Sequence, residues 1–157
     1  MRSSILFVSI LAVFVLLTAV PAQAQISNAD FENWTDDDPD SWTIVESGSN
    51  YVTEDAFAYS GSASAELLAT TSVGRVRLVQ YFNVDPNEAV TANLFVYDNE
   101  PSYTRLYLKV YDSDGLLLSQ EYDQSANSAS WQALNIELVT PANAAEIKFE
   151  VLYFYTG

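Results

Sequence analysis

Apolar and polar residues alternate with a period of two along most of the chain after residue 25. Short runs rich in Val, Tyr, Phe, Thr and Leu are separated by clusters of Gly, Asp, Asn, Pro and Ser, and no amphipathic helix stands out. The alternation predicts strands over residues 42–46, 50–54, 63–69, 75–84, 89–98, 103–112, 116–122, 131–139 and 145–155. Many short strands joined by turns favour an all-β fold, a β-sandwich or jelly roll of two antiparallel sheets.

The run 103–112 has the clearest pattern, because its aliphatic residues Leu106, Leu108 and Val110 share one face. Burial of each large aliphatic side chain is worth roughly 1.5 to 3 kcal/mol, so this face is predicted to lie in the core. The opposite face carries Tyr103, Arg105, Tyr107, Lys109 and Tyr111. The same split of the two preceding strands places Val76, Leu78, Phe82, Val84, Val90, Ala92, Leu94 and Val96 inward. An outer face rich in aromatic and cationic residues therefore recurs, although Gln80 falls among the inward positions.

The outward aromatic residues are candidates for a sugar site. A sugar ring has a flat apolar face and a rim of hydroxyls, so its site needs aromatic platforms beside fixed hydrogen-bonding groups. The predicted ligand-binding residues are Tyr81, Tyr97, Arg105, Tyr107 and Tyr111. A purely structural role is the alternative, because Tyr is a good strand former and cross-strand aromatic pairs stabilise a sheet without any ligand.

The first 24 residues have the features of a cleavable signal peptide. A single cation, Arg2, precedes an apolar run from Ile5 to Val20, and Ala22-Gln23-Ala24 fits the cleavage pattern. The run is shorter than the roughly 20 residues that a bilayer span needs. We therefore expect residues 1–24 to be removed and residues 25–157 to form one secreted domain, extracellular or periplasmic.

Charge and missing residue types narrow the function. The chain has a formal net charge of −15, no Cys and no His. Such an acidic surface repels phosphate backbones and anionic lipid headgroups, so we expect no nucleic-acid partner and no membrane partner after signal cleavage. The absence of His removes Ser-His and Cys-His catalytic pairs, and nothing singles out a pair of carboxylates for glycoside hydrolysis. We expect a monomer that is not an enzyme.

The acidic stretch at residues 36–40 has the Asp-x-Asp-x-Asp spacing of a calcium loop. Ser41 and Ser47 stand where the helix-loop-helix calcium site needs Gly and a bidentate Glu. We interpret the stretch as a solvated loop.

Several motifs occur in an order that resembles the carbohydrate-binding modules of families 4, 9 and 22. They are Asn28-Ala29-Asp30-Phe31-Glu32, Trp34 and Trp42, Tyr59-Ser60-Gly61-Ser62-Ala63-Ser64-Ala65, Gln80-Tyr81-Phe82-Asn83-Val84-Asp85-Pro86, and Ser130-Trp131-Gln132-Ala133-Leu134. The resemblance implies a jelly roll that binds polysaccharide without cleaving it. It also implies a structural Ca²⁺ held by the carbonyl of Asp30 and the carboxylate of Glu32, whose hard oxygens suit that ion.

The leading hypothesis is thus a secreted, non-catalytic module that recognises a polysaccharide or oligosaccharide through a Tyr-rich sheet face. The alternative is a structural or adhesive cell-surface β-sandwich domain whose Tyr-rich face packs on a protein partner.

Overall fold

The computed structural model describes residues 26–46, 51–68, 75–98 and 102–155, and within these ranges every regular element is a β-strand. The strands are β1 (Trp34–Thr35), β2 (Asp38–Pro39), β3 (Thr43–Glu46), β4 (Tyr51–Asp55), β5 (Ser64–Leu68), β6 (Arg75–Asn83), β7 (Ala89–Asp98), β8 (Ser102–Tyr111), β9 (Leu117–Gln124), β10 (Ser128–Val139) and β11 (Glu146–Tyr155). The described residues include no helix long and apolar enough to cross a membrane. The predicted signal peptide lies outside the described residues.

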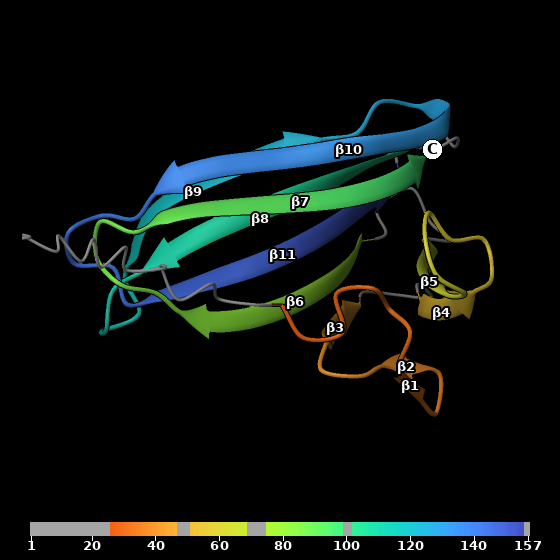
Figure 1. Ribbon diagram of the computed structural model, residues 1–157, viewed down its shortest axis with the longest axis horizontal. Helices are drawn as coiled ribbons and strands as arrows, with labels where there is room; N and C mark the ends of the chain where they lie inside the picture. Colours follow the sequence, from red (N-terminus) through yellow and green to blue (C-terminus); the bar gives the residue numbers. More distant parts are fainter. Residues whose placement is uncertain (1–25, 47–50, 69–74, 99–101, 156–157) are drawn as a thin grey trace, which may run out of the picture.

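The strands form antiparallel sheets in two packed layers (Figure 1). One layer is a five-stranded sheet in the order β3-β6-β11-β8-β9, with β11 at its centre. The long paired strands β7 and β10 lie across it, and β4 pairs with β5 in a separate hairpin. Neighbours in the large sheet are mostly not consecutive in the chain, so the chain crosses between layers. The predicted jelly-roll β-sandwich is confirmed.

The core lies between these layers. On β8, Leu106, Leu108 and Val110 are each 0% exposed, as the alternation predicts. Inward residues of β7 and β10, such as Val96 and Leu134, pack in the same hydrophobic cluster. The buried face of β8 therefore fixes the direction of the opposite face, which points away from the core.

Gln80, the polar exception among the inward positions of β6, binds the beginning of the described chain. Its side-chain amide accepts a hydrogen bond from the Ser27 N–H (3.0 Å) and donates one to the Ser27 carbonyl (2.7 Å). Both halves of the amide are therefore satisfied, which removes the cost of placing a polar group on this face.

The predicted strands agree with the observed ones to within a few residues, and the short hairpin β1–β2 was not predicted. Its connection contains Asp36 and Asp37, both exposed and both with positive φ. Asp36 and Asp37 thus form a solvated turn, as expected, but the expectation that the whole stretch is a loop is wrong, because Asp38–Pro39 form β2 and Pro39 is fully buried. A hairpin turn precedes β9, since Gly115 has φ +79° and its N–H donates to the Asp112 carbonyl at 3.1 Å.

Candidate carbohydrate-binding face

The outer face of the five-stranded sheet brings together most of the predicted binding residues. Tyr81 on β6 lies opposite Lys148 on β11, which lies opposite Lys109 on β8. Tyr107 on β8 lies opposite Tyr122 on β9. Directly paired residues in antiparallel strands point to the same side, so these side chains share one surface. We call it the tyrosine–cation face; its aromatic and charged side chains are Arg75, Arg77, Tyr81, Tyr103, Arg105, Tyr107, Lys109, Tyr111, Tyr122, Glu146, Lys148, Glu150 and Phe154.

Arg105 and Tyr107 are held together on this face. The Arg105 guanidinium donates from Nη1 to the Tyr107 hydroxyl at 3.0 Å and from Nε to Gln124 at 2.7 Å. It also lies 4.9 Å from the ring centroid of Tyr103 and 5.0 Å from that of Tyr122. The hydrogen bond to Tyr107 raises the pKa of Arg105, so this group is always charged. The arrangement fixes a cation between aromatic rings.

The tyrosines differ in exposure. Tyr81 is 56% exposed and Tyr122 is 54% exposed, which leaves large parts of both rings open to a ligand. Tyr107 and Tyr111 are half-buried. Burial raises the pKa of Tyr111, so its hydroxyl stays protonated near neutral pH. Exposed rings beside tyrosine hydroxyls provide stacking surfaces and hydrogen-bonding groups on one rigid sheet.

Glu150 lies at the centre of the face and is only 2% exposed. Its carboxylate is 2.6 Å from Lys148 Nζ, 3.0 Å from Lys109 Nζ and 3.5 Å from Arg77 Nε. Burial by itself raises the pKa of Glu150, but the hydrogen bonds and positive charges of Lys148 and Lys109 outweigh burial, so the pKa is lowered. One buried anion therefore holds three cations in place.

Tyr97 is not part of this face, so the expectation that it joins the other four predicted residues is wrong. It belongs to β7, which pairs only with β10 among the described strands, and it lies opposite Trp131. Alternation within a strand shows which residues point outward. It does not show which sheet the strand joins, so Tyr97 on β7 was wrongly grouped with the tyrosines of β6 and β8.

Around Tyr97 the structure forms an aromatic cluster that the sequence did not predict. It consists of Phe57, Tyr59, Phe95, Tyr97 and Trp131. Tyr59 stacks on Phe95 with ring centroids 3.8 Å apart, and Phe57 stacks on Trp131 at 5.4 Å. Phe95 and Tyr97 could have been found from the alternation of β7, but Phe57 and Tyr59 lie in a loop without periodicity.

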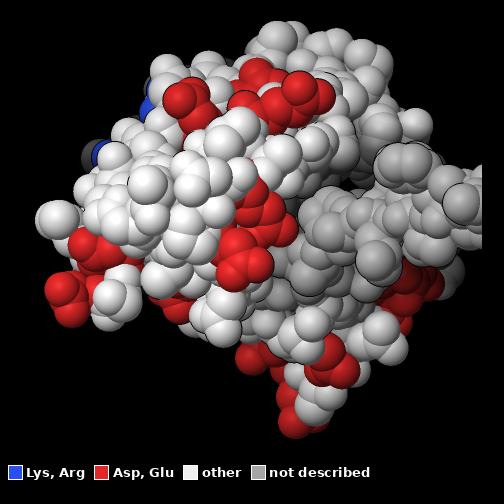
Figure 2. Space-filling view, turned by 60° about the vertical axis from the view of Figure 1, so that its left-hand side comes forward, with Lys and Arg blue, Asp and Glu red and all other residues white. Residues whose placement is uncertain are grey.

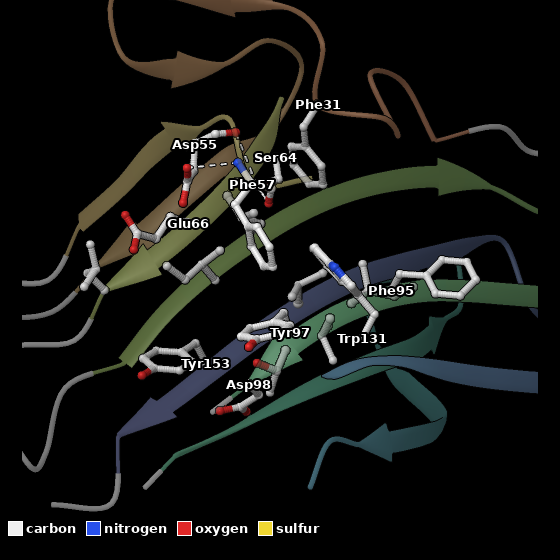
Figure 3. Close-up of a pocket in the computed structure, with 18 of the residues that line it drawn as sticks. Phe31, Asp55, Phe57, Ser64, Glu66, Phe95, Tyr97, Asp98, Trp131 and Tyr153 are labelled. Carbon is white, nitrogen blue, oxygen red and sulfur yellow. Dashed lines mark hydrogen bonds between the residues drawn. The ribbon is translucent and has the colours of Figure 1, made fainter. Parts of the chain in front are cut away.

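A pocket of about 610 Å³ opens beside this cluster, between the β4–β5 hairpin and β7 (Figure 3). Three carboxylates contribute to its lining, those of Asp55, Glu66 and Asp98. Asp98 is buried and accepts hydrogen bonds from the hydroxyls of Ser102 and Ser125. The rings of Phe57, Tyr59 and Phe95 are 52%, 53% and 43% exposed, so the cluster also leaves aromatic surface open to solvent.

A family model described as a carbohydrate binding domain, of the family 4 and 9 type, matches residues 23–155. The chain belongs to this family. The resemblance noted in the sequence is thereby confirmed, and carbohydrate binding is the function of the domain class.

This carbohydrate-binding domain is similar in fold to a solved structure. The enzymatically active domain of tailspike protein 4 from bacteriophage CBA120 matches with a TM-score of 0.64 and 18% identity, over 83% of this chain and 20% of that chain. This chain thus spans about a fifth of that protein's length, and the likeness shows the fold alone. The CBM22-1 xylan-binding domain of Paenibacillus barcinonensis Xyn10C matches with 19% identity over 80% of this chain and 90% of that chain, with a TM-score of 0.37. No curated protein matches the chain.

Glu32, one of the two residues that the family resemblance implies for Ca²⁺, has hydrogen-bond donors as its partners. Glu32 accepts hydrogen bonds from the N–H groups of Ser62 and Ala63, and from the Ser62 hydroxyl. These bonds lower the pKa of Glu32, the Ser62 hydroxyl contributing most. Ca²⁺ takes six to eight oxygen ligands, and the described residues contain no group of three or more acidic side chains that could hold a metal. The Glu32 carboxylate is thus bonded to two N–H groups and a hydroxyl, and no step below depends on Ca²⁺.

Gly61 makes the Glu32 contact possible, and this predicts a specific loss of stability in Gly61→Ala. Gly61 has φ +77°, and a Cβ added to it would overlap the Glu32 carboxylate. Gly115 has a similar φ of +79° but open space around its Cβ position, so it is a matched control. Gly115→Ala should cost only the backbone strain of about 1 to 2 kcal/mol. Gly61→Ala should lower the free energy of unfolding further, because it also separates Glu32 from its donors; equal losses in denaturant unfolding would contradict this role.

Proposed function

We propose that this domain is an exported, non-catalytic module that binds polysaccharide on the tyrosine–cation face. The observation that carries the proposal is the pair of exposed rings, Tyr81 and Tyr122, on the same surface as the Arg105–Tyr107 hydrogen bond. Aromatic rings stack on the flat faces of sugars, and the polar groups beside them can bind hydroxyls. Membership of the carbohydrate-binding family supports the same function.

The scaffold supports binding because the face is preorganised. Its central strands have fully buried residues on their other side, including Leu108 and Ile147, so the sheet cannot shift without disturbing the core. A ligand that meets rigid side chains loses less free energy to ordering them than one that meets mobile loops.

The lowered pKa of Glu150 argues against this residue acting as the acid of a glycosidase. A glycosidase needs one carboxyl whose pKa is raised so that it donates a proton to the leaving group. Glu150, the buried carboxylate at the centre of the face, has a lowered pKa and three cationic partners. It is therefore suited to hold its neighbours, and the release of reducing or unsaturated sugars by the purified domain would overturn this part of the proposal.

We expect Tyr107→Ala to weaken polysaccharide binding by about twofold to tenfold, because an aromatic contact is worth roughly 0.5 to 1.5 kcal/mol beyond its buried area. Affinity gel electrophoresis with a panel of soluble polysaccharides measures this change. Tyr59→Ala is the control, since Tyr59 is 53% exposed but belongs to the aromatic cluster beside β7. If Tyr59→Ala reduces binding and Tyr107→Ala does not, the site lies at the aromatic cluster and the proposed face is wrong.

A further inference from the structure

The cations of this acidic chain are concentrated on one surface. The chain has 21 acidic residues and only 6 cations, of which Arg2 lies outside the described residues. The remaining cations are Arg75, Arg77, Arg105, Lys109 and Lys148. All of them occupy outward positions of β6, β8 and β11, on the tyrosine–cation face. Cations that are far apart in the sequence are therefore gathered on a single sheet surface.

The acidic residues are distributed differently. At the outward positions of β6, β8 and β11 the only acidic residues are Glu146 and Glu150. Figure 2 shows another side of the molecule, where Asp and Glu are spread over the surface and Lys and Arg appear only at the upper left rim. The tyrosine–cation face thus has a local positive charge on a molecule whose net charge is strongly negative.

The need to neutralise Glu150 does not explain this concentration. One carboxylate is surrounded by three cations, so their local charges do not cancel. Arg105 donates hydrogen bonds to two neutral groups, the Gln124 amide and the Tyr107 hydroxyl. A guanidinium has five N–H donors in a planar fork, and these bonds use two of them. The rest of the fork can reach a carboxylate or sulfate that lies across the neighbouring rings.

We propose that the ligand of the tyrosine–cation face is an anionic polysaccharide, whose sugar rings stack on the tyrosines and whose carboxylate or sulfate groups pair with Arg105, Lys109 and Lys148. This inference rests on the proposed function and adds the chemical class of the ligand. The surrounding acidic surface disfavours anions elsewhere on the molecule, so it directs such a chain to this face. Single-stranded nucleic acid also combines stacking with negative charge, but the carbohydrate-binding family favours a glycan.

A panel of polymers tests the ligand class with the mature chain. The probes are polygalacturonate for carboxylates, dextran sulfate for sulfates, a neutral mixed-linkage β-glucan, and single-stranded DNA. We expect retardation by at least one anionic polysaccharide, weakened at least tenfold when the ionic strength rises from about 0.02 M to about 0.5 M, because salt screens exposed charges. Binding only to the neutral glucan would overturn this inference and leave the proposed function intact. Binding to none of the glycans would overturn both this inference and the proposed function. Tighter binding to DNA than to any glycan would mean that the ligand is a nucleic acid and would overturn the assignment of a glycan.

A charge-neutralising variant tests the site. Arg105→Gln should reduce affinity for the bound anionic polysaccharide by about threefold to tenfold, because it removes one charge pair on a partly desolvated surface. Glu137→Gln on β10, which neutralises an exposed charge on the other sheet, is the control and should leave affinity within about twofold. A circular dichroism melt of each variant establishes that it is folded. A folded Arg105→Gln protein with unchanged affinity and salt dependence would overturn the assignment to this face.

Discussion

Replacing Glu150 with alanine is expected to lower the free energy of unfolding by about 2 to 3 kcal/mol. Glu150 is 2% exposed and is the shared partner of Arg77, Lys109 and Lys148, so its removal leaves three neighbouring cations that repel one another. Breaking a buried ion pair by removing one partner costs about 3 to 5 kcal/mol. We expect a loss at or below the lower end of this range, because the three cations are partly exposed and water can stabilise them. Urea or guanidinium unfolding of the wild-type and variant proteins measures the difference.

Glu146→Ala is the matched control for this prediction. Glu146 lies on the same strand and the same face as Glu150, but at the end of β11, and it is only half-buried. Its removal should change stability by less than about 0.5 kcal/mol, as expected for a surface substitution. If both variants lose the same stability, Glu150 does not organise the cations, and the local balance of charge on the face needs another explanation.

The contribution of Glu150 should also depend on pH in a defined direction. Its pKa is lowered in the folded protein, so it binds protons less readily there than in the unfolded chain, where a glutamate titrates near 4.3. The stabilisation is therefore fully present above about pH 5 and is lost as the pH falls below the unfolded value and through the folded pKa. The stability difference between the wild-type protein and Glu150→Gln should shrink over that acidic range. A difference that grows on acidification would contradict the lowered pKa.

Leu108→Ala is expected to destabilise the domain by about 2 to 5 kcal/mol. Leu108 is 0% exposed and lies in the central cluster between the two layers, so truncation leaves a cavity that the close-packed sheet can fill only in part. Its neighbour Tyr107 points to the opposite side, and Tyr107→Ala should cost clearly less. Denaturant midpoints of the two variants, compared with Leu117→Ala at a 45% exposed position of β9, measure these differences.

The comparison between Leu108 and Tyr107 also tests the assignment of the two sheet faces. A Tyr107→Ala protein as unstable as Leu108→Ala would mean that the tyrosine side is packed against something essential to folding. The proposed polysaccharide face would then be wrong even if the domain still bound sugar.

The family motifs and the β-strands were predictable from the sequence because both depend on residues close together in the chain. The strand predicted over 103–112 is β8 at 102–111, and its alternating faces are as expected, because a half-buried strand requires every second residue to be apolar. The very short strands β1 and β2 were missed, since two residues cannot show a period.

The composition of the candidate site depended on pairing between distant strands. Tyr97 and Tyr107 have equivalent outward positions in their own strands, yet β7 pairs with β10 whereas β8 pairs with β11 and β9. No local pattern determines these partners. The aromatic cluster was missed for the same reason, because Phe57 comes from a loop that meets Trp131 only in the folded chain.

The charge distribution on the tyrosine–cation face follows partly from the sequence and partly from the pairing of distant strands. The sequence by itself determined that cations are scarce and that Arg75, Arg77, Arg105 and Lys109 lie at outward positions of strands with an apolar opposite face. Only the tertiary structure decided that β6, β8 and β11 lie side by side, so that Arg77, Lys109 and Lys148 surround the single carboxylate of Glu150. Alternation is a property of neighbouring residues, whereas the meeting of charges from three strands depends on hydrogen-bonded register across the whole sheet.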